Sequence, residues 1–273
     1  MNAPLRMGDK PSKPMDKPAV IMTHGAFCGG WAFEQFRQPF EAAGYTCLTP
    51  DLRGHGAGSQ RSATAGVSMS DYARDIAALI ETQAAPPILI GHSMGGLVAQ
   101  MAATRAPVRA LIVLAPSAPW GIAGGSLEEA ASATSLYALG PFWLQAIDPD
   151  YASAKLYSLD RMDRAQRKGV FDRMVPESGR AMWETLNWWL DPFMTTQVGR
   201  IAAPALALAG GRDLIHPTFT VRQTAERIGA EVKEFPEMSH WLLAEPGWAV
   251  VAAACLDWLA ALEPAREPQG SAR

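Results

Sequence analysis

The chain has 273 residues, of which 48% are hydrophobic and 19% are charged, and its formal net charge is −3. This length is enough to bury a full hydrophobic core, either as one domain with an insertion or as two small domains. A charge balance so close to neutral gives no electrostatic attraction to nucleic acid or to an anionic membrane, so we expect neither as a partner.

The three cysteines, Cys28, Cys47 and Cys255, are scattered along the chain. They are too few for a disulfide framework and form no cluster with the spacing of metal ligands, so we expect a reducing, cytoplasmic setting. No apolar run approaches the length of a membrane span, and residues 1–17 lack the apolar core of a secretory signal. We expect residues 1–17 and 264–273 to be flexible tails.

Short apolar runs alternate with helical patterns along both ends of the chain. The pattern predicts strands over 19–23, 45–49, 88–90, 108–114, 204–209 and 231–235. It predicts helices over 31–43, 70–83, 97–104, 218–228 and 248–262, with Ser70 and Asp71 as caps of the second helix. Such alternation is typical of a parallel sheet with helices on both faces, so the expected fold class is α/β.

The alternation is interrupted over residues 118–200, which carry helical segments, loops and many aromatic side chains but no clear strand. We expect this segment to be a helical cap over the carboxyl edge of the sheet, with residues 18–117 and 201–263 forming the core domain. Most of the aromatics should form the cap's own core, and only some should reach a pocket. The pocket candidates from the cap and the core domain are Phe27, Trp120, Phe142, Trp143, Trp183, Trp188 and Trp241.

The other predicted elements are arranged around residues 88–100. A wholly apolar strand leads through Gly91-His92-Ser93-Met94-Gly95 into a helix. A serine on such a turn is held in a strained conformation with its hydroxyl above the sheet. Glycines are expected at positions 91 and 95 because a side chain there would collide with the neighbouring helix and strand. The free N–H groups of the helix start can hold a developing negative charge.

Three reactive side chains follow the ends of three predicted strands, in the order Ser93, Asp213 and His240. A serine hydroxyl is a weak nucleophile and needs a base, imidazole can accept and return its proton, and a carboxylate fixes the imidazole tautomer. Considered alone, Asp213 would be interpreted as a turn aspartate, and His240 as a capping or core histidine. Together, in this order, they predict a catalytic triad.

Several further motifs accompany the triad over residues 18–262, and with them the chain resembles the α/β-hydrolase superfamily. They are His24-Gly25-Ala26, Asp51-Leu52-Arg53-Gly54-His55-Gly56, Gly210-Gly211-Arg212-Asp213 and Ser239-His240. The resemblance implies a mostly parallel sheet of about six strands flanked by helices, with a cap inserted after the third helix–strand unit. It also implies an oxyanion hole made by the backbone N–H groups of Ala26 and Met94, with Phe27 as the second choice for the first donor.

The loop from His24 to Trp31 resembles in particular the plant methylesterase and hydroxynitrile lyase branch of that superfamily. The lyases have a lysine just after the catalytic histidine, where this chain has Trp241, which disfavours lyase activity. Epoxide hydrolases and haloalkane dehalogenases of the superfamily have an aspartate as nucleophile where this chain has Ser93, so the resemblance excludes these two activities.

The remaining histidines and Cys28 have structural interpretations. We expect His24, His55 and His92 to hydrogen-bond the loops around the site. His216 either borders the pocket or caps a surface element. Cys28 adjoins the stretch around Ala26 in the loop after the first strand, which we call the oxyanion loop, and packing is a better interpretation of this cysteine than a second nucleophile.

The sequence therefore predicts a serine hydrolase that cleaves a carboxylic ester or lactone through an acyl-enzyme, with no metal and no organic cofactor. A small to medium hydrophobic substrate is expected because the cap is aromatic and carries no cluster of positive charge. The protein is expected to be a monomer or a homodimer. Thioesterase, carbon–carbon hydrolase and cofactor-free perhydrolase activities remain alternatives, as does a small-molecule-binding relative with little turnover. Among these alternatives the carbon–carbon hydrolase is disfavoured, because such enzymes of the superfamily often have asparagine where this chain has His92.

Overall fold

The computed structural model describes residues 17–56, 58–124, 127, 134 and 136–262. The predicted tails, residues 1–17 and 264–273, lie outside this part of the chain except for Lys17. Among the helices that the structure describes, none combines the length and the apolar character needed to cross a membrane.

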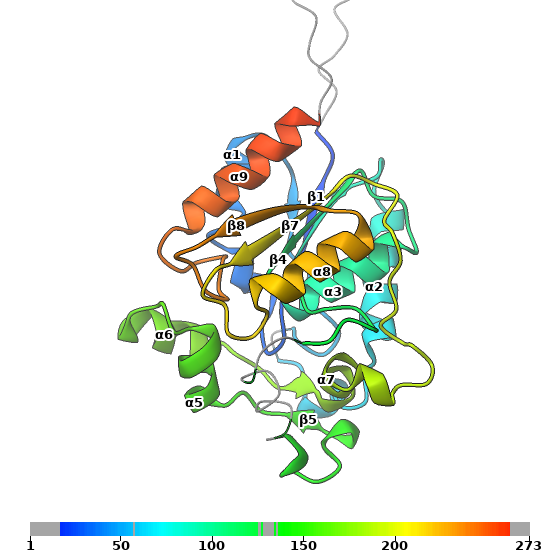
Figure 1. The fold of residues 1–273 in the computed structure, drawn as a ribbon, viewed down its shortest axis with the longest axis vertical. Coiled ribbons are helices and arrows are strands. Elements are labelled where there is room, and N and C mark those ends of the chain that lie inside the picture. The colour runs from blue at the N-terminus through cyan, green and yellow to red at the C-terminus, as the bar shows by residue number, and fades with distance from the viewer. Residues whose placement is uncertain (1–16, 57, 125–126, 128–133, 135, 263–273) are drawn as a thin grey trace, which may run out of the picture.

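A six-stranded sheet forms the centre of the molecule, with the strand order β2–β1–β3–β4–β7–β8 (Figure 1). Every neighbouring pair of strands is parallel. The strands are β1 (Val20–Thr23), β2 (Cys47–Leu48), β3 (Ile88–His92), β4 (Ala110–Leu114), β7 (Ala205–Gly210) and β8 (Glu231–Phe235). The chain moves outward from β1 to β2 and then returns to β3 on the other side of β1, which makes a switch point where such sheets form a ligand crevice.

Helices cover both faces of this sheet (Figure 1). One face carries α1 (Gln38–Ala42) and α9 (Trp248–Ala261), and the other carries α2 (Met69–Glu81), α3 (Met94–Ala103) and α8 (Thr218–Ile228). Successive side chains of a strand enter opposite cores: Ile88 and Ile90 pack with the first group of helices, whereas Leu89 packs with the second. The predicted α/β fold is confirmed, and this burial on two sides explains why its central strands are apolar throughout.

The segment 118–200, which we call the cap, connects β4 to β7, and its labelled helices lie at the bottom of Figure 1. Its helices include α5 (Tyr151–Ser153), a π-helical turn (Ala154–Ser158), α6 (Arg164–Phe171) and α7 (Gly179–Leu186), with 3-10 turns over Phe142–Leu144 and Trp188–Leu190. The prediction of no strand here is wrong. Strands β5 (Ala146–Ile147) and β6 (Glu177–Ser178) form an antiparallel pair, too short to leave an alternating pattern in the sequence.

Some predicted helix boundaries also differ from the structure, and α3 begins at Met94 rather than at residue 97. Helix α2 is capped by Ser68 rather than Ser70: the Ser68 hydroxyl accepts from the Asp71 N–H, and the Asp71 carboxylate accepts from the Ser68 N–H. The helix expected over 31–43 is divided into a 3-10 turn (Gly30–Phe33) and α1.

The turn from β3 into α3 packs backbone against backbone. Gly91 lies so close to the first turn of α3 that a Cβ there would be 2.7 Å from the Cα of Gly96. A Cβ on Gly95 would overlap the carbonyl oxygens of Thr23 and His24 at the end of β1. These glycines therefore allow the helix, β1 and β3 to meet at one point, as the sequence predicts.

We expect Gly95→Ala to lower the free energy of unfolding by about 1–3 kcal/mol, because β1 and α3 must move apart to accept the methyl group. Urea denaturation measures the change. Gly169→Ala is the control: this glycine lies within α6, and a Cβ at this position would have no neighbouring atom within 4 Å, so alanine there should stabilise the protein by about 0.5–1 kcal/mol. Equal unfolding free energies for wild type and Gly95→Ala would contradict the packing argument.

Candidate active site

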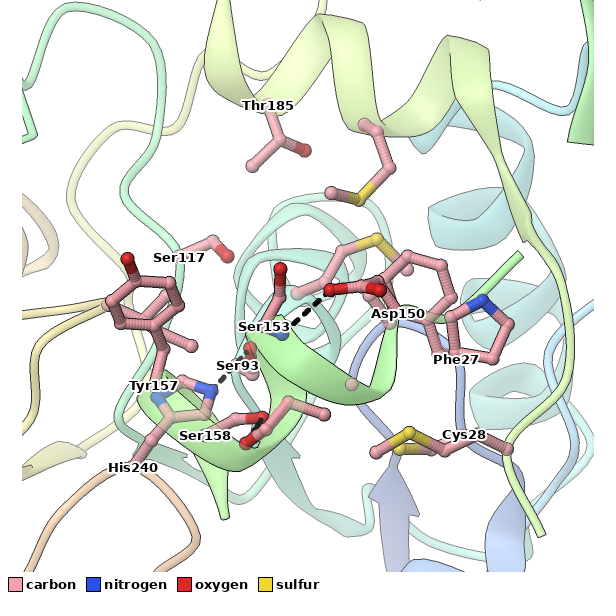
Figure 2. A pocket seen from close by; sticks show the side chains of 18 of the residues that line it. Phe27, Cys28, Ser93, Ser117, Asp150, Ser153, Tyr157, Ser158, Thr185 and His240 are labelled. Carbon is pink, nitrogen blue, oxygen red and sulfur yellow. Dashed lines mark hydrogen bonds between the residues drawn. The ribbon is translucent and has the colours of Figure 1, made fainter. Parts of the chain in front are cut away.

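Ser93 lies between β3 and α3 with φ 54° and ψ −126°, a conformation with positive φ that a non-glycine residue rarely adopts. The backbone on either side is fixed, because the Ser93 N–H donates to Leu114 O (3.0 Å) and the Ser93 carbonyl accepts from Gly96 N–H (2.8 Å) and Ser117 N–H (3.0 Å). The strained turn is therefore held by β4 and α3, and it presents the hydroxyl to a cavity (Figure 2).

His240 connects Ser93 to a buried carboxylate. Its Nε2 lies 3.0 Å from Ser93 Oγ, and its Nδ1 lies 2.9 Å from Asp213 Oδ2. The other carboxylate oxygen of Asp213 accepts the N–H groups of Ile215 (2.8 Å) and His216 (2.9 Å). The residues come from the ends of β3, β7 and β8, so the parallel sheet brings together three positions far apart in the sequence.

The Asp213 carboxyl is ionised at neutral pH. Burial opposes its charge, but the attraction and hydrogen bond of His240, together with His216, lower its pKa to about 2. An ionised carboxylate can only accept, so His240 Nδ1 carries a proton. In the neutral ring Nε2 is then the basic nitrogen, and it faces Ser93.

Two backbone N–H groups near Ser93 have no acceptor in the described part of the chain: Ala26 in the loop after β1, and Met94 at the first turn of α3. The alternative donor, Phe27 N–H, is used by the carboxylate of Glu177 at 3.3 Å. The predicted pair Ala26 and Met94 is therefore the pair with free donors, and both residues line the same cavity as Ser93.

His24 orients the peptide that carries the Ala26 N–H. The Leu52 N–H donates to His24 Nε2 (2.9 Å), so the ring proton is on Nδ1, which donates to Gly25 O (2.9 Å). Gly25 O and Ala26 N–H belong to one peptide plane, so this bond restrains the direction of the N–H. Burial, with repulsion from His55, lowers the pKa of His24 to about 4 and keeps the ring neutral.

The other buried histidines also hold loops. His92 Nε2 donates to the His240 carbonyl (2.9 Å), and burial, with His240 nearby, lowers the pKa of His92 to about 3. His216 lines the cavity and shares a hydrogen bond with Ser117 Oγ (3.0 Å). Cys28 lines the same cavity, and burial raises the pKa of its thiol, which disfavours the thiolate that a cysteine nucleophile needs.

The cavity beside Ser93 has a volume of about 230 Å³. Figure 2 shows Ser93 and His240 on one side, Phe27 and Cys28 on the other, and Thr185 of the cap above. Of the predicted pocket residues, Phe27 and Trp241 line it. The apolar part of the wall is made mainly by side chains that the sequence analysis did not select: Leu136, Ile147, Met174, Met182, Leu186 and Ile215.

The other five predicted pocket residues are not among the described residues that line the cavity. Trp120 packs edge-on against Trp188, and Phe142 packs against Trp143, with 5.5 Å between ring centroids in each pair. Trp183 lies on α7, where the cavity is lined by residues 182, 185 and 186. These three residues share one face of the helix, and Trp183 points elsewhere. Which face of α7 meets the cavity depends on how the cap is seated.

A family model described as "Alpha/beta hydrolase family" matches residues 20–254. The chain belongs to this family. The resemblance noted in the sequence is thereby confirmed, and the placement of Ser93, Asp213 and His240 at three strand ends of this α/β hydrolase agrees with its fold.

The alignments with similar proteins cover most of the chain. A carbendazim-hydrolysing esterase of Nocardioides sp. (strain SG-4G) is 25% identical over 240 residues, covering 86% of this chain and 90% of its own. An sn-1-specific diacylglycerol lipase of Mus musculus is 26% identical over 235 residues, covering 82% and 76%. Among solved structures, a methylesterase from Arabidopsis matches with a TM-score of 0.67 at 17% identity, covering 90% of this chain and 100% of that chain.

Glu245 supports the loop that carries His240. One of its carboxylate oxygens accepts the Ser239 N–H at 2.6 Å, and the other is buried with no hydrogen-bond partner in the described part of the chain. Burial raises the pKa of Glu245 to about 7, opposed by the Ser239 N–H and reinforced by the nearby Asp160.

This raised pKa predicts a pH dependence of stability. The unfolded carboxyl ionises near pH 4.5 and the folded one near pH 7, so the folded state binds more protons between these values and the unfolding free energy falls as pH rises. In Glu245→Gln this decrease is absent. The stability of Glu245→Gln relative to wild type should therefore increase by about 1–3 kcal/mol from pH 4.5 to pH 8. Urea denaturation across this range measures it, and parallel profiles would contradict the raised pKa.

Proposed function

We propose that the protein is a serine hydrolase that cleaves a carboxylic ester or lactone of a small to medium, largely apolar substrate through an acyl-enzyme. The continuous path of hydrogen bonds from Ser93 through His240 to Asp213, at the wall of the cavity, carries the proposal. The esterase and lipase names of the relatives support an ester as the substrate.

In this proposal His240 Nε2 removes the Ser93 proton as Oγ attacks the substrate carbonyl carbon. The resulting imidazolium is stabilised by Asp213 and returns the proton to the alcohol oxygen, and an acyl group is left on Ser93; the alcohol of an ester departs, whereas that of a lactone stays on the acyl chain. Water then attacks the acyl carbon as His240 takes its proton, and His240 passes this proton to Ser93 Oγ as the bond between Oγ and the acyl carbon breaks and the acid is released. Each step is supported by the 3.0 Å and 2.9 Å contacts of the ring, so the imidazole needs no rotation.

The negative charge that develops on the carbonyl oxygen is assigned to the N–H groups of Ala26 and Met94. Backbone donors suit this role because they are rigidly aimed, and the loss of one such donor typically costs about 100- to 1000-fold in rate. No step in this sequence calls for a metal ion or an organic cofactor.

The cavity supports the proposed substrate class. A volume of about 230 Å³ lies below the usual range of roughly 300–1,000 Å³ for small-molecule pockets, which favours compact acyl and alcohol groups. Methionine, leucine and isoleucine side chains form much of its wall, and no lysine or arginine lines it among the described residues. An uncharged ester or lactone fits this surface better than an anionic one.

We expect the wild-type protein to hydrolyse p-nitrophenyl esters, with a preference for short acyl chains over decanoate because of the cavity volume. Ser93→Ala should lose this turnover by at least about 1,000-fold. Release of p-nitrophenolate from acetate to decanoate esters, together with a small set of lactones, measures both expectations. Ser70→Ala is a matched control, since this serine lies on α2 and contacts the exposed Arg105.

Ester turnover by Ser93→Ala at the wild-type rate would contradict the serine mechanism. A folded wild-type protein that hydrolyses none of the panel and whose Ser93 does not react with a fluorophosphonate would also contradict the proposal, and would favour a binding role.

Asp213→Asn should lower kcat by about 10,000-fold, with little change in KM. An amide at this position can donate its N–H₂ to His240, which would move the ring proton to the nitrogen that faces Ser93. Steady-state kinetics on the best ester of the panel tests this expectation. A decrease of less than about tenfold would show that the carboxylate does not control the state of His240.

A further inference from the structure

The cap is hydrogen-bonded to the loop that carries the Ala26 N–H. Phe27, the next residue, donates its N–H to Glu177 Oε2 (3.3 Å), and its carbonyl accepts from the Val175 N–H (2.9 Å). Phe27 also adopts φ 63°, a conformation that is unfavourable for a bulky residue and persists only where surrounding contacts impose it. Both backbone polar groups of this strained residue are thus held by the cap segment 175–177.

Glu177 is a carboxylate with no exposure to solvent, on the cap strand β6. Besides Phe27 N–H, it accepts hydrogen bonds from Tyr72 Oη (2.7 Å), from its neighbour Ser178 N–H (2.7 Å) and from His55 Nε2 (3.0 Å). Four donors around one buried carboxylate favour its ionised form. Burial alone would raise its pKa, but His55 and these hydrogen bonds hold the pKa of Glu177 below its usual range.

His55 is the positive partner of this carboxylate. Its Nε2 faces Glu177, and its Nδ1 faces the Arg53 carbonyl at 3.2 Å. Both of these groups only accept, so both ring nitrogens carry protons and the ring is an imidazolium. Burial favours the neutral ring, but Glu177 raises the pKa of His55. The neighbouring His24 ring, 5.1 Å away, is neutral and holds Gly25 O.

Ala26 therefore lies between two peptide planes that are each held by a buried side chain, one from the loop itself and one from the cap. His24 holds the Gly25–Ala26 plane, and Glu177 holds the Ala26–Phe27 plane. We propose that Glu177 is a positioning residue of the cap that keeps the Ala26 N–H aimed at the developing oxyanion. This role rests on the proposed function, because it concerns the oxyanion of that reaction. It makes the seated cap a part of the catalytic geometry rather than a cover alone.

The variant Glu177→Gln separates the Phe27 contact from the others. The glutamine carbonyl can accept from Tyr72 and from Ser178 N–H, and its N–H₂ can donate to His55 Nε2 once that ring becomes neutral with its proton on Nδ1. The same N–H₂ then faces Phe27 N–H, and two donors cannot bond. The substitution therefore removes mainly the bond to the oxyanion loop and keeps the volume of the side chain.

Glu184→Gln is the matched control. Glu184 is a second buried carboxylate of the cap, on α7, and accepts from the Met69 N–H (2.8 Å) and from Arg180 Nε (2.8 Å). It joins the cap to the start of α2 and has no hydrogen bond to the oxyanion loop in the described part of the chain. A variant that only loosens the seating of the cap should resemble Glu184→Gln.

The experiment measures kcat and KM on the best ester, together with inhibition by a matched trifluoromethyl ketone. Ser93 Oγ adds to the ketone carbon, His240 takes the Ser93 proton, and the ketone oxygen becomes an alkoxide in the oxyanion hole. We expect Glu177→Gln to lower kcat by about 10- to 100-fold with KM within about threefold of wild type, and to weaken the ketone by a similar factor. Glu184→Gln should stay within about threefold in all three quantities.

A Glu177→Gln variant with wild-type kcat and ketone affinity would overturn the proposal. So would a Glu184→Gln variant that loses as much kcat and ketone affinity as Glu177→Gln, because the effect would then come from the seating of the cap. Hydrogen exchange of the Phe27 amide in the wild-type protein, followed by NMR, needs no variant. Slow exchange at Phe27 is expected, and exchange as fast as in an exposed loop would show that Glu177 does not hold it.

Failure of the proposed function is distinguishable. Wild-type protein without Ser93-dependent ester turnover overturns the serine esterase, while the Phe27 exchange measurement still decides whether the cap fixes the loop. Ser93-dependent turnover that is unchanged in Glu177→Gln overturns the positioning role alone.

Discussion

The close approach of backbone to backbone at the end of β3 is the constraint on which the site depends. Ser93 keeps its strained, positive-φ conformation because β4 and α3 hold its N–H and carbonyl, and because Gly95 lets α3 touch the carbonyl oxygens at the end of β1. The same contact brings the loop after β1 next to the nucleophile. A side chain at position 95 would separate the serine from the N–H that we assign to the oxyanion. The close packing at Gly95 is therefore also needed for the proposed chemistry.

Around this point the protonation state of each buried histidine follows from whether its neighbours donate or accept hydrogen bonds. His24 is neutral because it accepts a backbone N–H, whereas His55, 5.1 Å away, is charged because both its nitrogens face acceptors. His92 is neutral and supports the carbonyl of His240. A charge buried without a partner would be costly, and in this network the one imidazolium beside the oxyanion loop is paired with Glu177.

The cap has two relations to the core. Through its apolar side chains and α7 it completes the cavity, and through residues 175–177 it is hydrogen-bonded to the oxyanion loop. Trp120, Trp188 and Trp189 pack against one another and are not among the described residues that line the cavity, so the aromatic richness of the segment reflects how the cap is packed. Much of the cavity wall is formed instead by methionine, leucine and isoleucine, of which the unbranched methionine adapts most readily to the shape of its neighbours.

By itself the sequence determined the sheet, its helices and the positions of Ser93, Asp213 and His240, because apolar strands buried on both faces are visible locally and parallel strands must bring their carboxyl ends to one edge. The capping residue Ser68 and the two-residue strands of the cap were less visible, since local signals there compete or are too short. Only the tertiary structure decided which side chains line the cavity and what holds the oxyanion loop. Trp183 and Met182 are adjacent in sequence yet face different ways, and the face that meets the cavity is set by how α7 packs. Glu177 and Phe27 are 150 residues apart, and no periodicity records a contact between a cap strand and a loop of the core.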